Sequence, residues 1–336
     1  MTDELRLALP SKGELEEDTM RFMAASGLRV DRTNPRQYTA PISAAPNVKV
    51  LFQRANDILA KVEEGSADAG VTGLDIVRES TPEDGDAVVV MDLGFGRCEL
   101  VLAVPESWVD VTSLSDLADV ASGFKSKGRE LRVVTKFPNL TRQFLYRAGI
   151  TYFAVVEAHG ALEVAPSMGY ADIIADITSS GTTLRDNRLK RITGGSILHA
   201  QACLIANRKL LAASDAKLQT VKSIIELFEA HMRAADFLSV TANIQGESAE
   251  DVARSVMRIP ELAGLQGPSI GRVFAKDRSD AGWYATTVVV RKDLLLRTVE
   301  HLRKAGGSDV TVAALTYVFE ARSWNYHALL EKMRSQ

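Results

Sequence analysis

Short apolar runs rich in β-branched residues alternate with helical segments along the first part of the chain, and this alternation restricts the fold most strongly. Predicted strands cover residues 5–9, 47–53, 68–73, 88–93, 99–104 and 131–135, and predicted helices cover residues 12–25, 56–64 and 113–121. Strands that are separated by helices at short intervals usually pair in parallel, because each helix carries the chain back across the sheet. The sequence therefore predicts an α/β fold with mostly parallel strands.

The order of these elements predicts two α/β lobes that the chain connects by two crossings. The first lobe is expected to comprise residues 1–97 and 190–212, and the second lobe residues 98–189. Such lobes form a clamshell like that of periplasmic binding proteins, with the ligand between the carboxyl ends of the strands. Residues 213–236 are predicted to form a linker helix, and no internal repeat is evident.

After residue 236 the pattern changes to strand, helix, two strands, helix and strand. Predicted strands cover residues 237–245, 269–274, 283–290 and 309–319, and predicted helices cover residues 248–259 and 292–305. This βαββαβ order is that of a ferredoxin-like, ACT-like domain. Residues 237–336 hold no nucleophile or ligand cluster, so we expect a regulatory domain whose effector-binding residues stay unassigned.

The stretch Ala171–Leu184 indicates the chemistry. An apolar strand leads to Asp176, and a loop of small hydroxyl residues then precedes a helix start. A carboxylate at a strand end can hold sugar hydroxyls, while backbone N–H groups and hydroxyls hold phosphate oxygens. The residues expected to bind the phosphates are Thr178, Ser179, Ser180, Gly181, Thr182 and Thr183. The stretch predicts a site for a ribose that carries a pyrophosphate, and an ordinary capped turn is the alternative.

Basic residues at other strand ends favour the same interpretation. Lys12, Arg54, Lys136 and Arg142 all stand near turns after predicted strands. Phosphates suit such positions, because the adjacent helix starts add partial positive charge. Each of these residues taken alone could be a surface cation.

Other polar residues permit two interpretations. Glu163 is placed at a helix start, where it could face the cleft or interact with the helix dipole. Asp75 follows Gly73 and is interpreted as a turn residue. His159 is interpreted as structural, because it has no Ser–His–Asp or Cys–His pattern around it. Cys98 is interpreted as a packed small residue beside a base pocket.

Composition excludes several classes of partner. A formal net charge of −3 gives no general attraction to nucleic acid or to membranes. The start of the chain has no apolar signal segment, and no run of about 18 apolar residues could span a bilayer. The two cysteines lie far apart and form no metal-binding pattern, so we expect a cytoplasmic protein. No protein-built metal site is predicted, and Mg²⁺ would arrive on the phosphates.

Seven segments, taken in order, resemble the ATP phosphoribosyltransferase family, which opens histidine biosynthesis. They are Leu7–Gly13, Arg54–Ile58, Asp68–Asp75, Leu93–Cys98, Thr135–Arg142, Gly160–Pro166 and Asp176–Leu184. Three tail stretches, residues 241–248, 267–269 and 282–284, resemble the regulatory domain of the family's long form. Glu14 departs from the family pattern, because an arginine usually follows Lys-Gly there.

The resemblance implies a pentosyltransferase that joins phosphoribosyl pyrophosphate to N1 of the adenine of ATP and releases pyrophosphate. Asp176, Lys12 and Arg54 would be the catalytic residues. The residues that would bind ATP are Lys12, Gly73, Arg97, Cys98, Lys136, Arg142 and Glu163. The long form further implies a homo-hexamer, with a dimer as the alternative, and feedback inhibition by L-histidine.

Three other functions remain open at this point. A solute-binding protein shares the clamshell but normally carries a signal peptide or an anchor. Prephenate dehydratase combines a similar clamshell with a βαββαβ tail, but it needs a Thr-Arg-Phe signature where this chain has Thr141-Arg-Gln-Phe144. A catalytically silent regulatory subunit is the third alternative, which the change at Glu14 keeps open.

Overall fold

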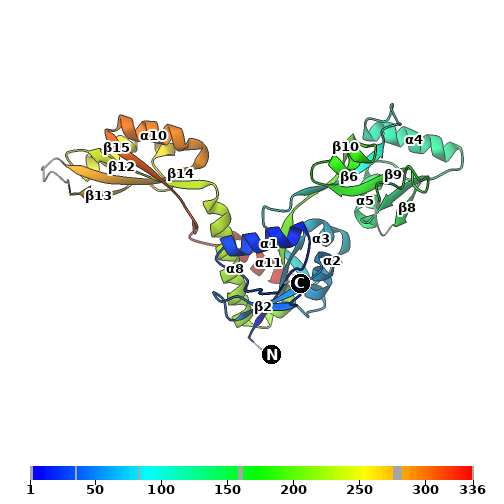
Figure 1. Cartoon of the computed structure of the whole chain (residues 1–336), viewed down its shortest axis with the longest axis horizontal. Helices are drawn as coiled ribbons and strands as arrows, with labels where there is room; N and C mark the ends of the chain where they lie inside the picture. Colours follow the sequence, from blue (N-terminus) through cyan, green and yellow to red (C-terminus); the bar gives the residue numbers. More distant parts are fainter. Residues whose placement is uncertain (1–2, 35, 82–83, 158–161, 275–281, 335–336) are drawn as a thin grey trace. The chain divides into compact units, whose positions relative to one another are not determined.

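The computed structural model describes residues 3–34, 36–81, 84–157, 162–274 and 282–334. The chain divides into two compact units, whose helices and strands are labelled in Figure 1. Unit 1 comprises residues 1–24, 28–222 and 325–336, and unit 2 comprises residues 25–27 and 223–324. Unit 1 contains two α/β lobes, each built on its own sheet, and unit 2 contains a third sheet.

Lobe I is built on a sheet with the strand order β2-β3-β1-β4-β11-β5. The strands are β1 (Leu5–Pro10), β2 (Thr39–Pro41), β3 (Val48–Gln53), β4 (Ala69–Gly73), β5 (Ala87–Asp92) and β11 (Ala202–Asn207). The helices are α1 (Glu14–Ala25), α2 (Ala55–Glu63), α3 (Leu74–Ser80) and α7 (Arg208–Ala212). Strand β1 runs parallel to β3 and β4, so the residues that follow these three strands meet at one edge of the sheet.

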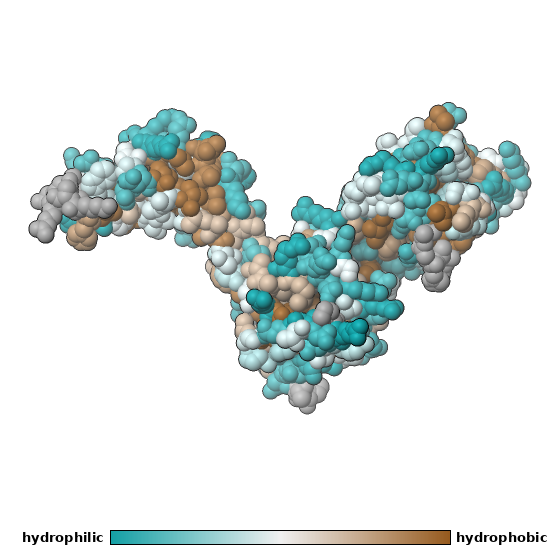
Figure 2. All heavy atoms as spheres, viewed as in Figure 1, coloured by the Kyte–Doolittle hydropathy of each residue, from teal (hydrophilic) through white to brown (hydrophobic). Residues whose placement is uncertain are grey.

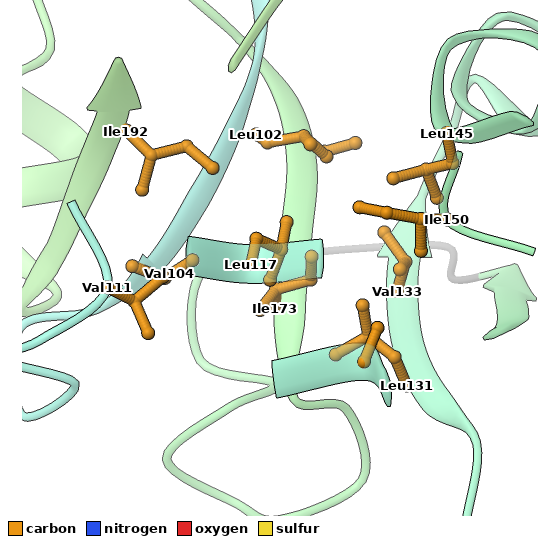
Figure 3. Packing of buried hydrophobic residues seen from close by; sticks show 12 residues of the cluster. Leu102, Val104, Val111, Leu117, Leu131, Val133, Leu145, Ile150, Ile173 and Ile192 are labelled. Atoms are coloured by element: carbon orange, nitrogen blue, oxygen red, sulfur yellow. The ribbon is translucent and has the colours of Figure 1, made fainter. Parts of the chain in front are cut away.

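Lobe II is built on a sheet with the strand order β10-β6-β9-β7-β8. The strands are β6 (Cys98–Pro105), β7 (Leu131–Thr135), β8 (Phe153–Glu157), β9 (Ile173–Thr178) and β10 (Leu189–Ala200). The helices are α4 (Leu114–Ser126), α5 (Pro138–Arg147) and α6 (Thr182–Asp186). Figure 3 shows how Leu117 and Leu145, on α4 and α5, pack against Leu102, Val133 and Ile173 of the sheet to form a buried core.

The structure confirms the predicted α/β class but corrects one division of the chain. Residues 190–212 were expected in lobe I, yet strand β10 pairs with β6 of lobe II from Leu189↔Pro105 to Ala200↔Cys98. The antiparallel pairing and the burial of Ile192 in the core of lobe II explain the difference. Within the range 190–212, only the part from β11 onward joins the sheet and helices of lobe I.

A shared ion-pair motif relates the two lobes, although the sequence had shown no repeat. In lobe I, Arg6 of β1 donates two side-chain hydrogen bonds and one backbone hydrogen bond to Asp68, which precedes β4. In lobe II, Arg132 of β7 does the same to Asp172, which precedes β9. Both acids stand in a Gly-x-Ala-Asp sequence and are almost fully buried. Each motif ties together the starts of two neighbouring strands.

Unit 2 has the predicted βαββαβ order. It comprises β12 (Phe237–Gln245), α9 (Ala249–Val256), β13 (Ser269–Val273), β14 (Trp283–Arg291), α10 (Leu295–Lys304) and β15 (Gly307–Ala314). The strand order β13-β14-β12-β15 is antiparallel throughout and is that of a ferredoxin-like domain. The Ser248 hydroxyl caps α9 by accepting a hydrogen bond of 3.1 Å from the Asp251 N–H. Figure 2 shows apolar residues gathered on the visible surface of this unit beside α10.

Two long helices connect the units. Helix α8 (Asp215–Ala234) leaves lobe I, where its Lys217 Nζ donates a hydrogen bond of 2.9 Å to Asp68. Helix α11 (Trp324–Arg334) brings the chain back, because residues 325–336 group with unit 1. The Leu329 side chain of α11 is fully buried, and Lys332 donates to the Val89 carbonyl of β5. The predicted regulatory domain, residues 237–336, is therefore too long at its end.

Candidate active site

Strand β9, the loop at residues 179–181 and helix α6 form the predicted strand–loop–helix. Gly181 has a φ of 74°, a conformation that favours glycine. The Thr178 hydroxyl accepts a hydrogen bond of 2.8 Å from the Gly181 N–H and so closes the loop. The Ser180 and Thr182 hydroxyls lie 3.0 Å apart. The loop thus gathers hydroxyl groups beside the end of β9.

A cavity of about 330 Å³ lies between this loop and lobe I. Its lining residues are Glu14, Leu15, Asp18, Gly73, Asp75, Ile76, Gly96, Arg97, Cys98, Ile177, Thr178, Ser179, Ser180, Thr183 and Ala202. The predicted site residues among them are Gly73, Arg97, Cys98, Thr178, Ser179, Ser180 and Thr183. Both lobes contribute to the cavity, as the predicted clamshell requires.

Asp176 lies inside β9, two residues before its end, and does not line the cavity described above. Its carboxyl group is half-buried, and burial raises its pKa. The Ile177 N–H, 2.8 Å away, and the charge of Lys136 lower that pKa, whereas Glu163 raises it. Two other predicted site residues, Lys136 and Glu163, therefore lie close enough to Asp176 to influence its ionisation.

The other predicted basic residues lie outside the described lining of the cavity. Lys12 follows β1 and Arg54 follows β3, and the pairing Pro10↔Gln53 brings these two exposed residues to the same sheet edge. Arg142 is half-buried on α5. Glu163 was expected at a helix start, but residues 163–169 form turns. His159 lies outside the described residues.

Asp75 lines the cavity, although its sequence context predicted a turn residue. Its side chain is 8% exposed and lines the cavity at the start of α3. Burial raises its pKa, although its own N–H and that of Ile76 oppose the shift. A Cβ on Gly73 would lie 2.2 Å from the Asp75 Oδ1, so a larger residue at position 73 would have to displace this carboxyl group. No signal in the sequence distinguishes Asp75, because a carboxyl group two residues after an apolar strand also occurs in ordinary turns.

Helix α1 supplies three further residues of the lining, Glu14, Leu15 and Asp18. Together with Asp75 these place three carboxyl groups against one guanidinium, that of Arg97. Cys98 also faces the cavity, where burial and the nearby Asp75 raise the pKa of its thiol to about 11. The thiol therefore stays neutral near pH 7 and can serve only as a weak hydrogen-bond donor.

The described residues contain no group of three or more His, Cys, Asp or Glu side chains arranged to hold a metal ion. Among the helices of the described segments, none has the length and apolar character that crossing a membrane requires.

Comparison with known families gives the decisive observation. The model of the ATP phosphoribosyltransferase family matches residues 54–230, and that of the HisG C-terminal domain matches residues 234–317. The chain belongs to the ATP phosphoribosyltransferase family. ATP phosphoribosyltransferase 2, chloroplastic, of Arabidopsis thaliana is 41% identical over 98% of this chain and 81% of its own length. The ATP phosphoribosyltransferase of Nitrobacter winogradskyi is 36% identical over 95% of each chain.

The fold agrees with a solved member of the family. The ATP phosphoribosyl transferase (HisG:HisZ) complex from Thermotoga maritima matches with a TM-score of 0.51 and 24% identity, over 67% of this chain and 96% of that one. The chain is therefore an enzyme of the pentosyltransferase class that acts at the first step of histidine biosynthesis. A solute-binding protein, a prephenate dehydratase and a silent subunit are set aside as alternatives.

Proposed function

We propose that the cavity between the lobes is where the chain transfers a phosphoribosyl group from phosphoribosyl pyrophosphate to N1 of the adenine of ATP. One observation carries this assignment. Thr178, Ser179, Ser180 and Thr183 of the hydroxyl-rich loop of lobe II face Gly73, Asp75 and Ile76 of lobe I across one cavity. Donor and acceptor would thus be held by different lobes.

The donor side of the proposed site is the strand–loop–helix of lobe II. Asp176 would accept hydrogen bonds from the ribose hydroxyls, because its half-buried carboxylate lies close to the loop. The Ser179, Ser180 and Thr183 hydroxyls and the backbone N–H groups of the loop would hold the 5′-phosphate and the pyrophosphate. Gly181 and Thr182 would complete this loop.

The acceptor side is the wall of lobe I. Asp75 would accept a hydrogen bond from the adenine amino group, and Gly73 would line the base pocket. Cys98, at the start of β6 in lobe II, would line the same pocket with Arg97 nearby. Lys12 and Arg54 stand together at the carboxyl edge of the sheet and would counter the triphosphate charge. Three residues of lobe II that are not in the lining of the cavity would also bind ATP: Lys136, Arg142 and Glu163.

The chemical step forms the bond from adenine N1 to ribose C1 and breaks the bond from C1 to the pyrophosphate oxygen. The N1 lone pair is the nucleophile, so the chain's main task is to align it with C1. The Asp176 carboxylate would stabilise the positive charge that develops on the ribose ring. Hydroxyls and N–H groups of the donor loop would stabilise the negative charge on the departing pyrophosphate, and each such donor can contribute about 3 kcal/mol.

Mg²⁺ fits this site as part of the substrate. The lining carries three carboxyl groups and one guanidinium, so a polyanion would be repelled unless a cation accompanied it. Because the described residues offer no cluster for a bound metal ion, the phosphates would supply the ligands. Mg²⁺ would neutralise pyrophosphate charge there.

Unit 2 is proposed as the regulatory domain that binds L-histidine, in a cytoplasmic homo-hexamer. Its ferredoxin-like fold is of the kind that serves regulation and assembly. Large apolar side chains are exposed on this unit at Met257, Leu265, Phe274, Leu296 and Val312, which suits contacts between subunits.

Pyrophosphate release from the full chain tests this proposal. We expect release that needs ATP, phosphoribosyl pyrophosphate and Mg²⁺ together and that falls when free L-histidine is added. Pyrophosphate release without Mg²⁺ would refute the proposal that Mg²⁺ is needed to neutralise the phosphates. Release at the same rate with and without L-histidine would refute regulation by unit 2. Sedimentation analysis would test the hexamer.

A further inference from the structure

Glu79, near the end of α3 in lobe I, joins the start of α5 in lobe II. Its carboxylate accepts hydrogen bonds of 2.8 Å from the Asn139 N–H and 2.9 Å from the Leu140 N–H. In return, the Asn139 side-chain amide donates a hydrogen bond of 3.0 Å to the Glu79 backbone carbonyl. Three hydrogen bonds thus connect two helices that belong to different lobes.

Each helix has backbone groups at its end that form hydrogen bonds with the other helix. The first N–H groups of α5 have no acceptor inside the helix, and the Phe137 side chain at the cap position offers none. The Glu79 carboxylate fills that role, and its charge suits a helix start. The Asn139 amide satisfies a carbonyl in the last turn of α3, where such groups are otherwise unpaired.

The contact lies between elements that carry proposed site residues. The first turn of helix α3 carries Asp75 and Ile76, which line the cavity on the side of lobe I. Helix α5 follows the turn that carries Lys136, whose charge influences Asp176 on β9. A change at Glu79 would therefore alter the spacing between the two walls without touching either of them.

We propose that Glu79 is a positioning residue for the transfer, because its carboxylate holds lobe II at the distance from lobe I that in-line attack requires. This inference rests on the assignment of donor and acceptor to separate lobes. Alignment across two lobes is sensitive to small shifts, since a misplacement of about 1 Å can cost about 100-fold in rate.

Two variants test the role of the carboxylate. Glu79→Gln keeps the side-chain shape but loses the charge and one acceptor, and Glu79→Ala removes both hydrogen bonds. We expect kcat to fall about 10-fold in the first and further in the second, since a hydrogen bond to a charged group contributes the equivalent of about 10-fold. Binding of phosphoribosyl pyrophosphate with Mg²⁺, measured by calorimetry, should stay within about twofold, because its proposed loop lies within lobe II.

Glu63 offers a matched control. Its carboxylate also accepts two backbone hydrogen bonds, of 2.8 Å from Asp86 and 2.7 Å from Ala87, but all three residues lie in lobe I. Glu63→Gln removes the same kind of contact within one lobe. It should lower thermal stability as Glu79→Gln does, but leave kcat unchanged.

A distance measurement separates positioning from stability. Spin labels on exposed Ala60 of α2 and Gln143 of α5, in a chain with both cysteines replaced by alanine, report the spacing of the lobes. Glu79→Ala should broaden the distance distribution, and Glu63→Gln should leave it as in the parent chain. Should Glu79→Ala fail to fold, Glu79→Gln and Asn139→Ala carry the same comparison.

Three results would overturn the inference: kcat of the Glu79 variants within twofold of the parent, a rise in kcat, or an equal loss in Glu63→Gln. A rise would mean that the contact restrains turnover. If the parent chain itself released no pyrophosphate, the transfer assignment would fail instead, and the label distances would still decide whether Glu79 sets the spacing.

Discussion

At the scale of single residues, each lobe has a carboxyl group near the end of a strand beside the cavity, Asp75 buried and Asp176 half-buried. Asp75 follows β4 in lobe I and Asp176 lies near the end of β9 in lobe II. Burial raises the pKa of both groups. Each carboxylate is therefore costly to keep charged, and a ligand with hydrogen-bond donors would relieve that cost. Groups with shifted pKa values cluster at functional sites.

Replacing Asp176 by asparagine tests this residue directly. We expect Asp176→Asn to lower kcat at least about 100-fold, because a charge that stabilises the transition state is lost. The melting temperature should change little, since the side chain is only half-buried and contacts no other side chain as a hydrogen-bond partner among those described. Asp186→Asn, at an exposed position on α6, is the control and should keep full activity. Turnover near the parent value would remove Asp176 from the mechanism.

The thiol of Cys98 gives a prediction about pH. Burial and Asp75 raise its pKa to about 11, so its thiolate should be about 100-fold scarcer at pH 8 than that of an ordinary cysteine. Alkylation by iodoacetamide, followed by mass spectrometry, should accordingly be slow at pH 8 and accelerate up to about pH 11. Asp75→Asn should speed alkylation at pH 8. Rapid labelling of the parent chain at that pH would contradict the burial of this thiol.

The sequence predicted more of the cavity lining in the lobe II loop than on helices α1 and α3 of lobe I. Ser179, Ser180 and Thr183 could be predicted because hydroxyl groups and glycine in one loop are typical of phosphate binding. Asp75 and Asp18 could not, because a carboxyl group in a turn or on a helix face has the same local sequence whether it faces solvent or a cavity. Only the packing of α1 and α3 shows that these carboxyl groups face the cavity and not the solvent.

At the scale of elements, the end of α1 depends on one glycine. Gly27 has a φ of 79°, and a Cβ there would lie 2.3 Å from the Tyr317 hydroxyl oxygen. Tyr317 belongs to the segment between β15 and α11. A side chain at position 27 would therefore have to displace the Tyr317 hydroxyl from the end of α1.

Gly27→Ala should destabilise the chain more than Gly128→Ala does. Gly128 has a similar φ of 69° but open space around it, so its replacement costs only the backbone strain of about 1–2 kcal/mol. The clash with Tyr317 should add about 1 kcal/mol or more. Urea unfolding of both variants measures the difference. Adding Tyr317→Phe to Gly27→Ala should remove the extra loss of stability, because the clashing hydroxyl is gone. Equal stability of Gly27→Ala and Gly128→Ala would instead show that the Tyr317 side chain moves aside without cost.

Most elements were predictable because their apolar periodicity is strong, but their sheet membership was not. Strand β12 has the predicted bounds, and Ser248 caps α9 as expected. The local sequence of β10 resembles that of the other strands and does not indicate its partner, yet β10 pairs with β6 of lobe II and not with a strand of lobe I. Pairing partners far apart in sequence depend on the whole sheet, which local patterns do not encode. The last strand was expected at residues 309–319 but is Gly307–Ala314, because its pairing with β12 sets its bounds.

At the scale of the whole molecule, the chain leaves unit 1 through α8 and returns through α11. The returning helix could not be assigned from the sequence, because an amphipathic helix near the end of a chain fits any apolar surface. The burial of Leu329 and the hydrogen bond from Lys332 to Val89 show that α11 packs on lobe I.

Leu329→Ala should therefore destabilise lobe I, although the residue follows the regulatory domain in sequence. The side chain is 0% exposed, and truncating a buried leucine costs about 2–5 kcal/mol. Leu296→Ala, at a position on α10 that is 82% exposed, is the matched control and should cost less than about 0.5 kcal/mol. Hydrogen exchange at the amides of β5 should accelerate in the first variant alone. Unchanged exchange there would contradict the docking of α11 on lobe I.

The interleaved path of the chain has a consequence for its folding during synthesis. All five strands of lobe II lie within residues 98–200, so this lobe can close as soon as that stretch has left the ribosome. Lobe I starts first, but β4 has no partner on one side until β11 emerges, and α11 arrives only with residues 324–334. The lobe that is translated first is therefore completed last, and its open strand edge must be protected while the rest of the chain is made.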